Sequence, residues 1–213
     1  GLLEEDCRYY PEGNAKPSGL LQEYGEKGEL HFGLMTGSYG SNKSGGVLRK
    51  NIGDLADEIN VATDGTFKAT PTGGGIINAL NRLRIYGYDF NEGFYNNAGA
   101  NGDNCPWAMT SFNDGRCSNW GNPQSEIYLE SLRYLAGKAA TAGFASNDAD
   151  YIDGLTTASW ADPLSNQNYC APVNVIQFNA SVSSSDSDMG GATDLGVASV
   201  AAWTNHVGAA EGI

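Results

Sequence analysis

The sequence predicts an α/β fold, in which helices flank a sheet. Segments with the apolar spacing of strands alternate along the chain with segments that have the spacing of helices. The 213 residues suffice for a single domain with one substantial core. The 29 glycines and a charged fraction of only 17% indicate short elements separated by long, turn-rich loops. In this class of fold, binding loops gather at the carboxyl ends of the strands.

The first half of the chain is expected to supply three helices and a strand pair. Leu30, Phe32 and Leu34 alternate as in a strand, and the run "GSNKSGG" that follows can form a hairpin turn. Pro17 suits the start of the first helix and Gly25 suits its C-cap. The expected elements are a helix within 16–25, strands at 29–39 and 45–52, and helices at 54–60 and 76–84.

The second half is expected to contain two helices, one strand and two insertions. Asn122 can cap a helix at 123–137, with Pro123 in its first position. Its expected buried face consists of Tyr128, Leu132, Leu135 and Ala136. The run "VNVIQFNASV" (173–182) is apolar without strict alternation, which predicts a central strand buried on both faces. The remaining expectations are a helix at 193–206 capped by Thr193 and insertions at about 86–122 and 143–172.

The formal net charge of −13 disfavours partners that are themselves anionic, such as nucleic acids and acidic lipid surfaces. No apolar run is long enough for a membrane span. Acidic loops can bind calcium or can simply be solvated, and the sequence offers two acidic groups. They are Asp148, Asp150 and Asp153, and Asp186 with Asp188. Because neither group has the spacing of an EF-hand loop, we interpret them as solvated loops.

The sequence offers no motif for catalysis. The glycines of "TPTGGG" open a helix, but no lysine and hydroxyl residue follow them as a phosphate-binding loop requires. Neither G-x-S-x-G nor H-E-x-x-H occurs, and His31 and His206 are isolated. We therefore expect that the chain is not an enzyme and that it needs no cofactor.

Four cysteines, at positions 7, 105, 117 and 170, include no C-x-x-C pair. Cys105 and Cys117 enclose a loop with an Asn-Asp-Gly turn that can bring its two ends together. This pattern predicts a disulfide between them and an oxidising compartment outside the cytoplasm. The partners of Cys7 and Cys170 stay open.

Long stretches of the chain resemble one known family, the PilC/PilY proteins at the tips of bacterial type IV pili. The resemblance is to the von Willebrand A-like region that precedes a β-propeller, and it implies an N-terminally incomplete Rossmann-like sheet flanked by helices. It also implies an extracellular adhesion and pilus-assembly module, with pilins or minor pilins, host or abiotic surfaces and the β-propeller as partners. The matching stretches are 1–25, 31–53, 73–90, 105–138 and 173–184.

The resemblance also implies where a metal ion would bind. Von Willebrand A domains hold magnesium or calcium with a D-x-S-x-S loop, a threonine before a glycine-led helix and a later aspartate. Thr70 matches the threonine, Asn179 stands where the aspartate is expected, and no D-x-S-x-S occurs. We therefore assign no metal ligands, although calcium or magnesium stays open. The alternative is that the Thr70 hydroxyl caps the helix.

A second class of protein, a secreted glycan-binding or glycan-cleaving domain, is the alternative. It would need an exposed aromatic platform, because sugar rings stack on aromatic side chains. The candidates are Tyr95, Trp107, Phe112 and Trp120. The same side chains can instead fill a small satellite core beneath the loop.

Overall fold

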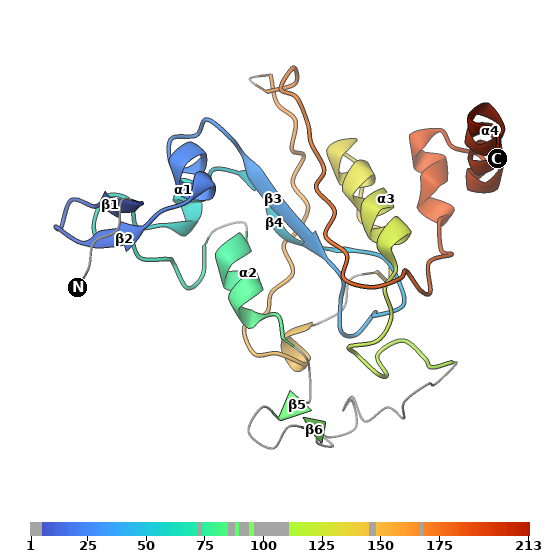
Figure 1. Cartoon of the computed structure of the whole chain (residues 1–213), viewed down its shortest axis with the longest axis horizontal. Helices are drawn as coiled ribbons and strands as arrows, with labels where there is room; N and C mark the ends of the chain where they lie inside the picture. The colour runs from blue at the N-terminus through green and yellow to red at the C-terminus, as the bar shows by residue number, and fades with distance from the viewer. Residues whose placement is uncertain are drawn as a thin grey trace. The chain divides into compact units, whose positions relative to one another are not determined.

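The structure is a computed structural model that describes residues 6–71, 74–84, 88–89, 94–95, 111–144, 148–166 and 168–213. The chain forms two compact units, which are described separately below. Figure 1 labels the helices and strands named in this description. Unit 1 consists of Gly1–Met35, Leu48–Arg84 and Asn147–Ser159, and unit 2 of Thr36–Val47, Ile85–Ser146 and Trp160–Ile213. The expectation of one domain with insertions at about 86–122 and 143–172 stays a prediction.

Unit 1 contains most of the strands. β1 pairs with β2 in antiparallel register, and β3 with β4 form a second two-stranded sheet, which confirms the expected strand pair. Helices α1 and α2 are confirmed, whereas the helix expected at 54–60 is a short 3-10 turn. In order, the elements are β1 (Cys7–Tyr9), β2 (Ala15–Pro17), α1 (Leu20–Gly25), β3 (Phe32–Thr36), β4 (Val47–Gly53), η1 (Leu55–Glu58), α2 (Ile76–Arg82) and η2 (Asp148–Asp150).

A small apolar core holds α1 close to η1 and β3. A Cβ atom on Gly25 would lie 2.7 Å from the Cβ of Leu55 and 2.9 Å from a ring carbon of Phe32, so a larger residue would push these elements apart. Gly25 is thus the last residue of α1 rather than its cap, and its role is close packing. The core consists of Tyr10, Leu55 and Ile59, with Leu21, Phe32 and Val61 packed against it.

Unit 2 is built around α3, which confirms the helix expected at 123–137. Tyr134 of α3 makes an edge-on contact with Trp160, with ring centroids 5.4 Å apart. The element η3 also packs against α3. The elements of unit 2 are β5 (Tyr88–Asp89), β6 (Phe94–Tyr95), α3 (Gln124–Leu135), η3 (Gly190–Leu195) and α4 (Val200–Glu211).

The buried face of α3 differs from the expected one. Tyr128 is 42% exposed, whereas Glu126 and Glu130 are fully buried. The expectation assumed that the apolar stripe of the helix faces the interior. Here the acidic side chains point inward, because loop groups surround that face and supply hydrogen bonds to the carboxylates.

The segment 173–182 is not the central strand that the sequence predicts. It has no regular secondary structure, and every residue in it is exposed. An apolar run forms a buried strand only where another strand pairs with it. No described segment pairs with the backbone of residues 173–182. The prediction of a strand buried within this chain is therefore wrong.

The helix expected at 193–206 is also corrected, because it divides into η3 and α4. Gly196 adopts a left-handed conformation with φ of 80°, and this conformation ends η3. Ser199 then accepts a hydrogen bond from the Ala202 amide at 3.1 Å and caps α4. The cap is therefore Ser199 and not Thr193.

In content the chain is α/β, with small two-stranded sheets among the described strands. None of these strands forms a larger von Willebrand A-like sheet. No helix in the described ranges is long and apolar enough to cross a bilayer.

Candidate functional site

The most elaborate polar arrangement of unit 2 gathers loops around α3, and we call it the α3 clasp. Its side chains belong to Asn42, Glu126, Glu130, Arg133 and Asp186, and they fasten the loops 38–46, 111–121 and 184–191. Four of the five residues are buried, and Asp186 is half-buried. Buried polar groups are costly unless they are hydrogen-bonded, so this arrangement constrains where the loops lie.

Asn42 holds the loop that contains Cys117. Its side-chain amide donates to the carbonyl oxygens of Arg116, Cys117 and Trp120 at 3.0, 3.0 and 2.7 Å. Its side-chain oxygen accepts from the Gly115 amide at 2.9 Å. One buried asparagine therefore satisfies several backbone groups of a loop that has no regular secondary structure.

Asp114 fastens the same two loops from the other direction. Its carboxylate accepts from the Lys43 amide at 2.8 Å and from the Ser44 hydroxyl at 2.9 Å. The Lys43 ammonium group donates to the Phe112 carbonyl at 2.7 Å and lies 5.3 Å from the centre of the Phe112 ring. The contact therefore combines a hydrogen bond with a cation–π interaction.

Asp186 occupies the amino end of α3. Its carboxylate accepts from the Ser125 amide at 2.7 Å, the Ser125 hydroxyl at 2.6 Å and the Glu126 amide at 3.2 Å. A carboxylate at this position satisfies free helix amides and is favoured by the helix dipole. Asn122, the expected cap, instead donates to Asn179 at 2.9 Å.

Glu126 ties the segment after Ser185 to the loop before β4. Its carboxylate accepts from the amides of Gly45, Asp188 and Ser187 at 2.6, 2.7 and 3.1 Å. Burial raises the pKa of Glu126, and the nearby Asp188 carboxylate raises it further, while the three amide hydrogen bonds lower it. Burial is the largest cause, so the net direction is upward.

Glu130 and Arg133 complete the polar face of α3. Glu130 accepts from the Thr141 amide at 3.0 Å and from its hydroxyl at 2.6 Å, and it lies 2.8 Å from the Arg133 side chain. Arg133 donates to the carbonyls of Gly191 at 3.0 Å and Ala139 at 2.7 Å. It also pairs with Asp194. These contacts attach η3 and the end of α3 to each other.

The carboxylates of the α3 clasp hold loops through hydrogen bonds. Each carboxylate oxygen of Glu126 and Glu130 already accepts a hydrogen bond. Sequence reasoning missed these residues because acidic side chains are expected at the surface. One signal was available: positions 126, 130 and 133 follow the spacing of one helix face.

The first turn of α2, which follows the glycine turn of unit 1, binds a carboxylate of the chain itself. Glu58 accepts from the Ile77 amide of α2 at 3.0 Å. Gly74 forms an isolated bridge with Lys50, and a Cβ atom there would lie 1.9 Å from the Arg49 carbonyl oxygen. Gly74 therefore allows close approach to β4.

Two roles were considered for Thr70, a metal ligand and a helix cap, and no contact confirms either of them. Its side chain is exposed, and Gly75 is the residue that caps α2, so the interpretation of Thr70 as the helix cap is wrong. Asn179, the other candidate ligand, accepts from the Asn122 side chain and from the Ser181 amide at 3.2 Å.

The two acidic groups considered as calcium sites lie in different environments. Asp148 is buried in an ion pair with Arg49, whereas Asp150 and Asp153 are exposed. Asp186 and Asp188 lie at the α3 clasp. Among the described residues, no three His, Cys, Asp or Glu side chains are grouped to hold a metal ion.

The histidines have structural neighbours. His31 lies 2.9 Å from the Asp54 carboxylate, and His206 makes an edge-on contact with Trp203 at 5.8 Å between ring centroids.

The aromatic and cysteine predictions fall partly outside the described residues. Phe112 and Trp120 are half-buried, while the side chains of Tyr95 and Trp107 lie outside the described part. Cys117 is buried, and Cys105 is not among the described residues, so their disulfide stays a prediction. Cys7 and Cys170 carry free thiols.

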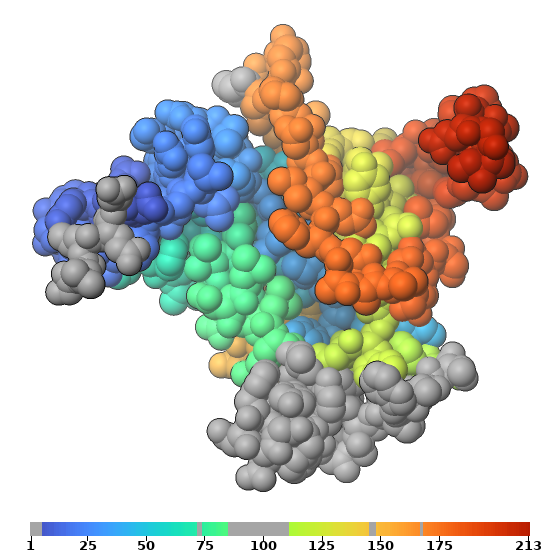
Figure 2. Space-filling view, in the orientation of Figure 1, coloured from blue at the N-terminus to red at the C-terminus, as the bar shows by residue number. Residues whose placement is uncertain are grey.

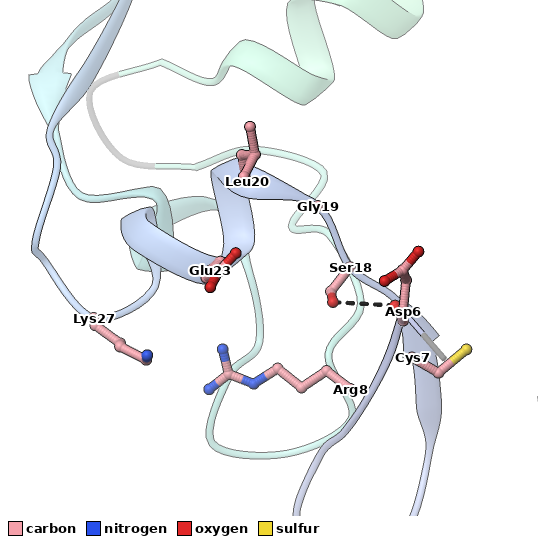
Figure 3. A pocket seen from close by; sticks show the side chains of 8 residues that line it. All are labelled: Asp6, Cys7, Arg8, Ser18, Gly19, Leu20, Glu23 and Lys27. Carbon is pink, nitrogen blue, oxygen red and sulfur yellow. Dashed lines mark hydrogen bonds between the residues drawn. The ribbon is translucent and has the colours of Figure 1, made fainter. Parts of the chain in front are cut away.

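A hollow of about 550 Å³ lies in unit 1 beside β1 and α1 (Figure 3). Its lining mixes both signs of charge, and Arg8 is paired with Glu26 at 2.5 Å. Ser18 closes part of the rim by donating to the Asp6 carbonyl at 3.1 Å. The lining residues are Asp6, Cys7, Arg8, Ser18, Gly19, Leu20, Glu23 and Lys27.

Fold and site together define an α/β module whose buried polar side chains hold its own loops. Comparison with known proteins identifies the family. The chain belongs to the PilY1 homologs, because the family profile described as "PilY1 homolog, second domain" matches residues 32–213.

One curated relative is described as "Type IV pilus biogenesis factor PilY1 homolog", from Xylella fastidiosa (strain Temecula1 / ATCC 700964). It is 34% identical in an alignment of 146 positions that covers 65% of this chain and 9% of the relative. The chain therefore spans only a small part of the length of the curated relative that it matches. No solved structure matches the chain.

Proposed function

We propose that this chain is an adhesion and assembly module of a type IV pilus tip protein, which acts outside the cell and without catalysis. The observation that carries the proposal is the match to the second domain of PilY1 homologs over residues 32–213. The curated relative is described as a type IV pilus biogenesis factor, which supports the assembly role.

The buried acidic side chains of α3 support a binding role, because they hold surface loops in fixed positions. Glu126 and Glu130 hold loop amides, so in unit 2 these carboxylates fix a surface. We propose pilins or minor pilins as partners, together with host or abiotic surfaces. We also propose that the chain belongs to a von Willebrand A-like region of a larger protein that carries a β-propeller.

The test removes the region matching residues 32–213 from the full-length protein in its own bacterium. The expected result is fewer surface pili, measured in sheared fractions, and weaker attachment of the cells to glass and host cells. Normal piliation and normal attachment together would overturn the proposal. Separately, glycan breakdown by the purified protein, in an assay of released reducing sugar, would refute a role without catalysis.

A further inference from the structure

The segment 173–178, which we call the exposed segment, leaves large apolar side chains uncovered. Val173, Val175, Ile176 and Phe178 are 53, 40, 77 and 88% exposed. In Figure 2 the orange part of the chain that includes this segment lies on the face in view. Contiguous exposed apolar side chains of this kind mark a surface that another part of a protein covers.

The backbone of the exposed segment is also unpaired. Within the described ranges, no amide or carbonyl group of residues 173–178 has a hydrogen-bond partner in the backbone. The carboxyl end of the segment is nevertheless held in place. The Gln177 side chain donates to Gln124 Oε1 at 2.7 Å, and Asn122 donates to Asn179. A strand-forming run with free backbone groups is a template for the addition of another strand.

Both faces of the exposed segment are apolar. In an extended chain successive side chains point to opposite faces, so Val173 and Val175 share one face while Ile176 and Phe178 share the other. Residues with this pattern are buried on both sides in natural sheets. A partner that covers one face only would leave the other in water.

A second element of unit 2 is uncovered as well. In α4, no residue is buried, and Val200, Trp203 and Val207 are 37, 59 and 50% exposed. Their spacing places them on one side of the helix. An apolar helix stripe normally packs on a sheet or another helix. Unit 2 thus has more apolar surface than its described residues cover.

We infer that the exposed segment is a docking surface for apolar β-strands from elsewhere in the same longer polypeptide. The length of the family supports this occupant, because the aligned region is 9% of the curated relative. In a symmetric dimer, the exposed segments of the two copies would pair along one edge, and the other edge of each segment would stay unpaired. A transient peptide would likewise cover one edge. Only a sheet built into the same protein covers both edges and both faces. The inference rests on one part of the proposed function, namely that the chain is part of a larger protein.

The test measures amide hydrogen exchange at residues 174–178 in the full-length protein and in the 213-residue chain. The expected result is exchange about a hundredfold or more slower in the full-length protein. Fast exchange in the full-length protein would overturn the inference. Protection that appears in the short chain only as its concentration rises would identify a second copy as the occupant, and would also overturn it.

A pair of variants gives an independent readout. Ile176→Asp places a charge on the docking surface, and Ile176→Leu keeps an apolar side chain of the same volume at the same position. In the full-length protein, we expect Ile176→Asp to lower the melting temperature by several degrees and to remove the protection at 174–178. Ile176→Leu should leave both close to wild type. Equal effects of the two variants would contradict a buried strand contact.

Discussion

Arg49 and Asp148, 99 residues apart in the chain, form an ion pair in which neither side chain is exposed. Arg49 also donates to the Thr156 carbonyl at 3.1 Å. Close by, the Ala158 amide donates to the Leu48 carbonyl at 2.8 Å, so β4 is bound to residues 156–158 by both side chain and backbone. This relationship makes the late segment 148–159 part of unit 1.

We predict that Asp148→Ala strongly destabilises the chain. The substitution leaves the Arg49 guanidinium buried without its counter-charge, which costs about 3–5 kcal/mol of unfolding free energy. Urea unfolding followed by tryptophan fluorescence measures the loss. Asp153→Ala is the control, because Asp153 lies in the same segment with an exposed side chain. Similar losses for both variants would contradict the buried ion pair.

A second prediction concerns Gly74 and Gly13, which both adopt positive φ, at 89° and 78°. An alanine at Gly13 meets open space, whereas its Cβ at Gly74 would lie 1.9 Å from the Arg49 carbonyl oxygen. Gly13→Ala should cost about 1–2 kcal/mol through backbone strain alone. Gly74→Ala should cost at least about 2 kcal/mol more, because β4 must move. Equal unfolding free energies for the two variants would show that the glycine turn does not pack on β4.

A third prediction concerns pH. The pKa of Glu126 is raised above its ordinary 4.5, mainly by burial. Between that ordinary value and the raised one, the folded chain holds a proton that the unfolded chain has lost, so the stability contributed by Glu126 falls as pH rises. The variant Glu126→Gln removes this titrating group. The unfolding free energy of wild type, minus that of the variant, should therefore increase as the pH is lowered from about 7 to about 5.

The experiment is urea unfolding of both proteins across this range of pH. The other carboxylates are common to the two proteins, so the difference isolates Glu126. A difference that stays constant, or one that grows as the pH rises, would contradict the raised pKa.

Local patterns in the sequence predicted individual helices and strands correctly. They failed where burial depends on residues that are distant in the sequence. The alternation at Leu30 to Leu34 was enough to predict the β3–β4 pair, and the proline-led run after Asn122 was enough to predict α3. The buried face of α3 was missed because Glu126 faces amides that come from distant loops. The strand expected at 173–182 was wrong because burial needs a covering surface, which an apolar run such as Val175–Phe178 does not reveal. No local sequence pattern predicts the ion pair of Arg49 with Asp148.

A fourth prediction is the disulfide between Cys105 and Cys117. A crosslink that closes this short loop contributes about 3 kcal/mol by restricting the unfolded chain. Peptide mapping without reduction, on protein recovered from its native compartment, should yield the two peptides joined. Recovery of both cysteines as alkylated free thiols would refute the disulfide and weaken the extracellular assignment.

The most direct test of the central claim is the number of surface pili on cells whose full-length protein carries Asn42→Ala. The variant removes the side chain that holds residues 115–120, and amide exchange in the purified protein verifies the loosening. Asn113→Ala, an exposed change in the neighbouring loop, is the control. The account predicts several-fold fewer pili per molecule of protein with Asn42→Ala and wild-type numbers with Asn113→Ala. Wild-type piliation despite a loosened α3 clasp would contradict the claim that unit 2 is an assembly surface.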